Sequence, residues 1–334
     1  MPVPFIIGGI AVAAGLKGVE KTIHAAAQNK DAKNINQRAE NLYESSKHTL
    51  NAARKASHFA LEGLGEAKLT ILTQSVNPFI DVFSKIHNVE LTESVGLEEM
   101  KQFKLDKQAF EDMKQLGSVA VSLIGGLVGG SMAGSLAAFG AYGATMTFAA
   151  ASTGTAIASL SGIAATNATL AFLGGGSLAA GGLGMAGGTM VLGGLVAGPA
   201  LAVLGFFLDA KASKNLDTAR SNMAEARKIS EEFQLATELC NGISDRAKMF
   251  FDLLVELDGI FKPLISKLEF LVELNGCDYA EYSPAAQKVV AMSVATAAAI
   301  KKVLDTPILT TEGHLTENSL LISGEIRNLI NTLK

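Results

Sequence analysis

The stretch QLGSVAVSLIGGLVGGSMAG at residues 115–134 begins a long charge-free part of this chain. From Gln115 to Leu208, 94 residues contain no Asp, Glu, Lys, Arg or His, and 22 of them are glycine. One helical crossing of a bilayer takes about 20 residues, and an average globular helix has about 11. Residues 115–208, called the uncharged segment below, are therefore predicted to pack in a membrane or in a very tight helical core.

The charged residues all lie on either side of the uncharged segment. The 28 Lys and Arg and the 32 Asp and Glu give these flanks the charge density of ordinary globular proteins. We predict four parts: an apolar N-terminal anchor at 1–18, an N-terminal helical arm at 19–114, a membrane-inserting part at 115–208, and a C-terminal coiled coil or helical bundle at 209–334. Residues 1–18 have no basic side chain before their apolar run, unlike a classical signal peptide. Both an interfacial anchor and a buried helix fit them.

Both flanking arms have the sequence pattern of helices. From Ile229 to Leu271, apolar residues alternate at spacings of three and four, which is typical of a coiled-coil seam or a long bundle helix. No segment alternates like a strand between hairpin turns. The sequence therefore predicts an all-α fold, an elongated helical bundle with coiled-coil arms around a Gly/Ala-rich hydrophobic helical hairpin. The predicted seam residues are Ile229, Phe233, Ile243, Phe250, Leu254, Leu257 and Phe261.

Three local features refine the C-terminal arm. Pro263 is predicted to kink the long helix without ending it. Ser283 followed by Pro284 predicts the start of the next helix, with serine as the cap and proline in the first turn. Cys240 falls within the apolar repeat, so we interpret it as a small core residue rather than a reactive thiol.

Glycines in the uncharged segment recur at four-residue intervals. In a helix this spacing clears side chains from one face, so that helix backbones approach closely in lipid. In water, each glycine costs a helix about 1 kcal/mol relative to alanine. The pattern predicts glycine zippers that bring helices, and copies of the chain, together. The predicted packing residues are Gly126, Gly130, Gly134, Gly184, Gly188, Gly194 and Gly198.

Basic residues flank the uncharged segment at both ends, for example Lys107 and Lys114 before it and Lys211 and Lys214 after it. Because positive side chains stay on the cytoplasmic side of a membrane, both ends are predicted to lie on one side. The number of passes is then even, and both two and four fit. The middle of the segment is mostly Gly, Ala, Ser and Thr, so its insertion is expected to be marginal or cooperative.

The sequence contains no pattern that predicts catalysis. Gly182, Gly184 and Gly187 match a dinucleotide fingerprint by letter, but no strand precedes them as that site requires. No phosphate-binding loop and no metal-ligand pairing of histidines occur, so we predict neither an enzyme nor a cofactor nor a metal. The net charge of −4 supplies no basic face for nucleic acid.

The chain resembles a family of uncharacterised bacterial proteins with the same layout. The resemblance rests on MPVPFIIGGIAVAAGLKG at 1–18, the polar helix after it, the heptad tail and, most specifically, residues 152–199. In architecture alone, helical arms around a Gly/Ala-rich apolar hairpin are similar to apolipoprotein L-like proteins and α-helical pore-forming toxins. That likeness implies a soluble form that shelters the hairpin and a membrane form that exposes it.

Taken together, these patterns favour a membrane-inserting, oligomerising helical protein that permeabilises or remodels a bilayer, as a pore-forming toxin or an anti-phage defence effector. Its expected partners are the lipid bilayer and further copies of the chain, in the bacterial cytoplasm and inner membrane. Two alternatives remain open. One is a constitutive membrane scaffold whose coiled-coil arm binds a protein partner, and the other is a soluble, tightly packed helical bundle.

Overall fold

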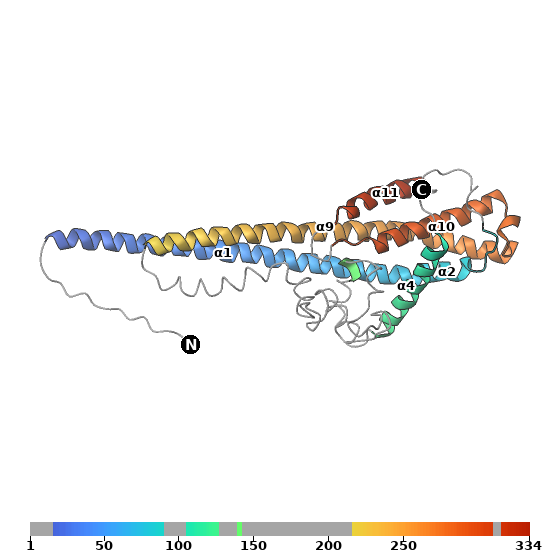
Figure 1. Ribbon diagram of the computed structural model, residues 1–334, viewed down its shortest axis with the longest axis horizontal. Helices are drawn as coiled ribbons and strands as arrows, with labels where there is room; N and C mark the ends of the chain where they lie inside the picture. The colour runs from blue at the N-terminus through green and yellow to red at the C-terminus, as the bar shows by residue number, and fades with distance from the viewer. Residues whose placement is uncertain (1–15, 90–104, 127–138, 142–215, 310–314) are drawn as a thin grey trace. The chain divides into compact units, whose positions relative to one another are not determined.

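The computed structural model describes residues 16–89, 105–126, 139–141, 216–309 and 315–334. Across these ranges the secondary structure is helical and contains no β-strand, so the prediction of an all-α fold is confirmed. The elements are α1 (Leu16–Ile71), the π-helical turn η1 (Leu72–Val76), α2 (Asn77–Phe83), α4 (Lys107–Gly126), α9 (Leu216–Asn275), the 3₁₀ turn η6 (Tyr279–Glu281), α10 (Pro284–Asp305) and α11 (Asn318–Leu333) (Figure 1). Of the segment predicted to form a two- or four-pass hairpin, only residues 115–126 and 139–141 are described, so the number of passes stays a prediction.

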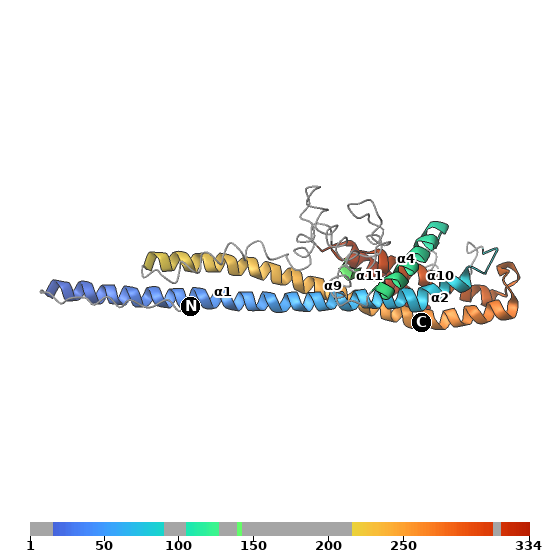
Figure 2. The same ribbon diagram turned by 90° about the horizontal axis from the view of Figure 1, so that it is seen from below.

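The chain divides into two units, and both long helices contribute residues to each. Unit 1 contains residues 1–48 and 199–234. Within it, the first part of α1 and the first part of α9 run side by side (Figure 2). The rings of Tyr43 and Phe233 lie 5.7 Å apart, and the Asn222 amide donates to the Asn36 side chain at 3.0 Å. Ile229 and four small residues of this unit, Ala32, Ala39, Ala219 and Ala226, are also buried.

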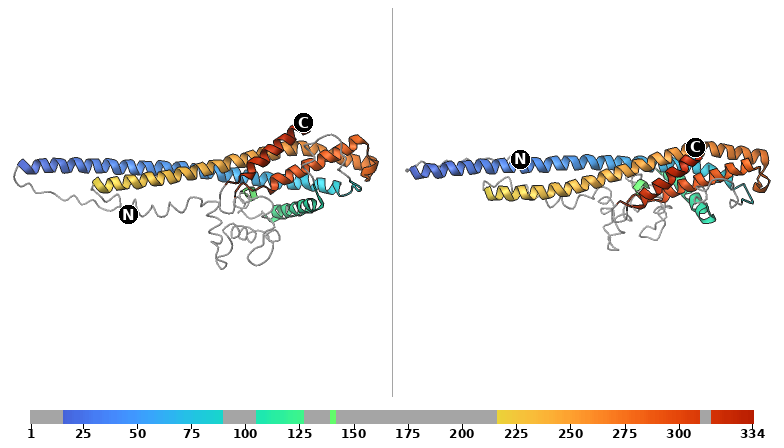
Figure 3. Two further views of the ribbon diagram at one scale, coloured as in Figure 1. Left: turned by 45° about the horizontal axis from the view of Figure 1, so that its top comes forward. Right: turned by 90° about the horizontal axis from the view of Figure 1, so that it is seen from above.

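Unit 2 contains residues 49–198 and 235–334. Its core is formed by the later parts of α1 and α9 together with α2, α4, α10 and α11. Phe79 is fully buried, and its ring lies 5.2 Å from both Phe83 and Phe261. Figure 3 shows α11 beside α10, where Lys302 and Glu325 form an ion pair at 2.5 Å. Large aromatic and aliphatic side chains supply most of the stabilisation in such a core.

All seven residues predicted for the α9 seam are buried. In unit 1, the ring of Phe233 packs against Tyr43 of α1. In unit 2, the seam residues from Ile243 to Phe261 belong to a core that draws on several helices. The same three-four repeat therefore meets two surroundings, because a repeat fixes which face of a helix is buried and not what covers it.

The structure confirms two predictions about where helices continue and begin. Pro263 lies inside α9, which continues to Asn275. Ser283 caps α10 by accepting a hydrogen bond from the Ala286 N–H at 3.3 Å, and Pro284 is the first residue of that helix. Proline fits there because the first turn has no intrahelical use for its missing N–H.

The junction of α1 and α2 is a π-helical turn. The Asn77 N–H donates to the Leu72 carbonyl, one residue further back than in an α-helix. Pro78 follows at the start of α2. Because a proline ring clashes with the carbonyl four residues before it, a wider turn at this point relieves a conflict that an α-helix would carry.

Candidate functional site

Two described parts of the uncharged segment pack within unit 2. The first is residues 115–126, the second half of α4, in which Leu116 and Ala120 are buried. The second is the short piece 139–141, drawn in green beside α1 in Figure 1, in which Ala141 is fully buried. Helices of the charged flanks thus form the surface on which these parts of the uncharged segment lie.

The side chain of Asn77 contacts the backbone of the first part, residues 115–126. The side-chain amide of Asn77 donates to the Gly117 carbonyl at 3.4 Å. A Cβ added at Gly117 would collide with the Asn77 side-chain oxygen, so the absence of a side chain permits this approach. The contact joins the start of α2 to the main chain of α4.

Lys68 holds the second part. Its side chain is 0% exposed, and its Nζ donates to the Phe139 carbonyl at 3.2 Å and to the Gly140 carbonyl at 3.1 Å. The same nitrogen lies 5.7 Å from the centre of the Phe139 ring. A lysine this deeply buried is uncommon, because removing an ammonium from water is costly unless the charge is paired.

Gly140 allows the two backbones to touch. A Cβ at this position would fall well inside contact distance of the Leu61 carbonyl oxygen, 3.0 Å from the Leu61 carbonyl carbon and 3.2 Å from the Gly65 nitrogen. These are main-chain atoms of a helix and have little freedom to move aside. The piece 139–141 therefore depends on glycine to lie directly on α1.

The residues after α10 hold the same piece from another element. The Ile308 N–H donates to the Ala141 carbonyl at 2.8 Å, and the Leu309 N–H does so at 3.3 Å. Both Ile308 and Leu309 are buried. We call the hydrogen bonds of Phe139–Ala141 with Lys68, Ile308 and Leu309 the docking contact. In each of these bonds the acceptor is a main-chain carbonyl of the uncharged segment. The contact therefore depends on the backbone of residues 139–141 and not on which side chains they carry.

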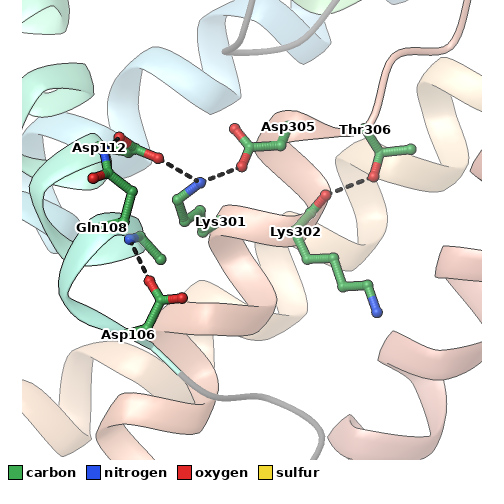
Figure 4. A network of polar contacts seen from close by, with 8 residues as sticks. Asp106, Gln108, Asp112, Lys301, Lys302, Asp305 and Thr306 are labelled. Carbon is green, nitrogen blue, oxygen red and sulfur yellow. Dashed lines mark hydrogen bonds and ion pairs between the residues drawn. The ribbon is translucent and has the colours of Figure 1, made fainter.

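Burial controls the charge of Lys68. Desolvation lowers the pKa of Lys68 from 10.5 to about 7, and the charge of Asp305 opposes this shift. Asp305 is itself engaged with Lys301 at 2.5 Å, and Lys301 also lies 3.8 Å from Asp112 on α4 (Figure 4). Because its carboxylate is shared in this way, Asp305 compensates the cost of a charged Lys68 only in part.

The polar network in Figure 4 fixes the start of α4 against α10. The Asp106 carboxylate accepts from the Ala109 N–H at 2.7 Å and so caps the helix, while Gln108 donates to Asp112 at 2.8 Å. At the end of α10, Thr306 donates to the Lys302 carbonyl at 2.6 Å. This network positions the helix that leads into the uncharged segment.

A second polar cluster lies between α1 and α9. Burial raises the pKa of the Cys240 thiol, against the opposing effects of a hydrogen bond with Ser57 and the charge of Arg54. A thiol with a raised pKa is a weak nucleophile, in agreement with the interpretation of Cys240 as a core residue. Within the described ranges, the buried Nε and Nη2 atoms of Arg54 and the Ser244 hydroxyl have no hydrogen-bond partner.

The predicted packing glycines fall mostly outside the described residues. Gly126 is the last residue of α4, whereas Gly130, Gly134, Gly184, Gly188, Gly194 and Gly198 lie in ranges that the structure does not describe. The glycine zipper therefore stays a prediction. Sequence reasoning did not identify Lys68, although a signal was present: it lies four residues after Leu64 and four before Leu72, on the buried stripe of α1.

No family model, curated protein or solved structure matches the chain. Among the described residues, no group of His, Cys, Asp and Glu could hold a metal ion. No helix within those same ranges combines the length and the apolar character that a membrane crossing requires.

Proposed function

We propose that this protein is a membrane-inserting helical protein that oligomerises and permeabilises or remodels a bilayer. The observation that carries the proposal is the docking of two parts of the uncharged segment on unit 2 through hydrogen bonds to main-chain carbonyls. A chain that carries its own binding surface for an apolar segment has a form in which that segment is held before it meets lipid.

The strength of the docking contact suits a reversible role. Each hydrogen bond contributes a net of about 0.5–1.5 kcal/mol, so the few bonds of Phe139–Ala141 amount to a modest barrier to release. The uncharged segment offers no charged side chain whose transfer into hydrocarbon would oppose insertion.

Purified protein mixed with dye-filled liposomes tests this function. We expect the protein to float with the liposomes and to release the dye, because an even-pass apolar hairpin that oligomerises opens a path through the bilayer. A constitutive scaffold would need detergent from the start and release nothing. A soluble bundle would neither float nor release dye, and either of these outcomes would overturn the proposal.

Substitution of Gly130 by leucine tests the predicted glycine zipper. We expect Gly130→Leu to abolish the oligomer and the dye release while membrane affinity changes little, because the added side chain separates helix backbones without adding charge. Ser135→Leu is the matched control, since in a helix it adds bulk roughly 140° around the axis from Gly130. Oligomer size by crosslinking and leakage rate are the measurements. If both are unchanged in Gly130→Leu, the zipper hypothesis is wrong.

A further inference from the structure

The neutral amine of Lys68 has as many N–H groups as there are carbonyl acceptors around it. A neutral amine has two N–H groups, and the described surroundings offer two acceptors, the carbonyls of Phe139 and Gly140. An ammonium carries a third N–H and a full charge inside a site that is closed to water. Binding a proton adds a third N–H and a charge. Among the described residues, the two carbonyls and the Phe139 ring at 5.7 Å offset only part of the hydration that this charge has lost.

The charged groups around Lys68 give it limited support. Among the described residues, the charge that acts on Lys68 is that of Asp305 at the end of α10. Asp305 pairs with Lys301, which also approaches Asp112 on α4. The surroundings thus favour the ammonium less than a dedicated ion pair would, and burial brings the pKa of Lys68 down to about 7.

We propose that Lys68 makes the docking contact proton-sensitive: the neutral amine keeps Phe139–Ala141 on unit 2, and uptake of a proton by Lys68 loosens this piece of the uncharged segment. The inference rests on the proposed function for the destination of the released segment, a lipid bilayer. Phe250, Leu254 and Leu257 of α9 lie in the same apolar core as Ala141 but form none of the hydrogen bonds of the docking contact, so we expect the loosening to be confined to the piece 139–141.

Two amides report directly on the docking contact. The N–H groups of Ile308 and Leu309 donate to Ala141, so their hydrogen exchange accelerates when the piece 139–141 leaves. Leu254 in the middle of α9 reports unfolding of the core instead. Exchange is measured on the full chain without lipid at pH 8 and pH 6 and corrected for the intrinsic effect of pH on exchange.

We expect the protection of Ile308 and Leu309 to fall about tenfold from pH 8 to pH 6 and to stay below that of Leu254 at both pH values, as release without unfolding of the core requires. The factor follows from the one pH unit by which the higher pH lies above a pKa near 7, because only above this pKa has the docked lysine lost a proton that the released lysine keeps. Lys68→Met should abolish this pH dependence, and Lys55→Met, at an exposed position of the same helix, should retain it. Protection that does not change with pH in the natural protein, or that still changes in Lys68→Met, would overturn the inference.

A second variant covers the case in which Lys68→Met fails to fold. Asp305→Asn removes the carboxylate that favours the ammonium, so the pH at which Ile308 and Leu309 lose protection should move to a lower value. An unchanged midpoint contradicts the role of Lys68.

Dye release from liposomes at the same two pH values separates the two proposals. Exchange that responds to pH without leakage at either value upholds the Lys68 mechanism and overturns the proposed function. Dye release combined with hydrogen exchange that does not depend on pH supports the proposed function and overturns the Lys68 mechanism.

Discussion

The free energy of unfolding is expected to rise as the pH is raised from 7 to 10, and to rise less steeply once Lys68 is replaced by methionine. Below pH 7 the lysine holds a proton in both the folded and the unfolded chain, and the folded state carries the full cost of the buried charge. Between about 7 and 10.5 the unfolded chain keeps a proton that the folded state has lost, so stability increases with pH. At about 1.4 kcal/mol for each tenfold change in proton affinity, the gain over this range is about 5 kcal/mol.

The measurement is urea unfolding followed by circular dichroism at several pH values for the natural protein and Lys68→Met. The difference between the two should change by about 1.4 kcal/mol for each pH unit within the range. Taking the difference removes the contributions of the tyrosines and exposed lysines that both proteins share. Lys55→Met should follow the natural protein. Parallel curves for the natural protein and Lys68→Met would show that Lys68 is not desolvated in the folded state.

Gly140→Ala is expected to destabilise unit 2 by about 3 kcal/mol. The new methyl group cannot be accommodated beside the Leu61 carbonyl, so the piece 139–141 must move away from α1. This movement breaks the four hydrogen bonds that Phe139, Gly140 and Ala141 accept, each worth a net of about 0.5–1.5 kcal/mol. Exchange of the Ile308 and Leu309 amides should accelerate at every pH.

Gly63→Ala provides the control for this substitution. Gly63 lies in the same helix that Gly140 contacts, and a Cβ there meets nothing within 4 Å. Alanine should therefore stabilise α1 by up to about 1 kcal/mol through its higher helix propensity. The two changes are chemically identical and should have opposite signs. If Gly140→Ala is as stable as Gly63→Ala in urea unfolding, the close approach of 139–141 to α1 is wrong.

The helices could be predicted from the sequence because each depends on residues that are close together in the chain. Contacts between distant segments could not, because no local pattern marks them. The α9 repeat, the cap at Ser283 and the continuation through Pro263 are properties of neighbouring residues, and the structure contains them. Lys68 and Phe139 are 71 residues apart, and hydrogen bonds to a backbone carbonyl leave no requirement on the side chain that accompanies it. The apolar repeat of α9 also runs unbroken across the division at Gln234 and Leu235, so periodicity alone does not mark where one unit ends.

The π-helical turn between α1 and α2 changes the direction in which side chains point around the helix axis after the turn. Lys68 and Asn77 are nine residues apart, which in an uninterrupted α-helix would point them in roughly opposite directions. The turn at Leu72–Val76 absorbs one residue, and the angle between the two side chains shrinks to about 80°. One extra residue thus lets a single helical rod reach two separate parts of the uncharged segment, with an amine before the turn and an amide after it.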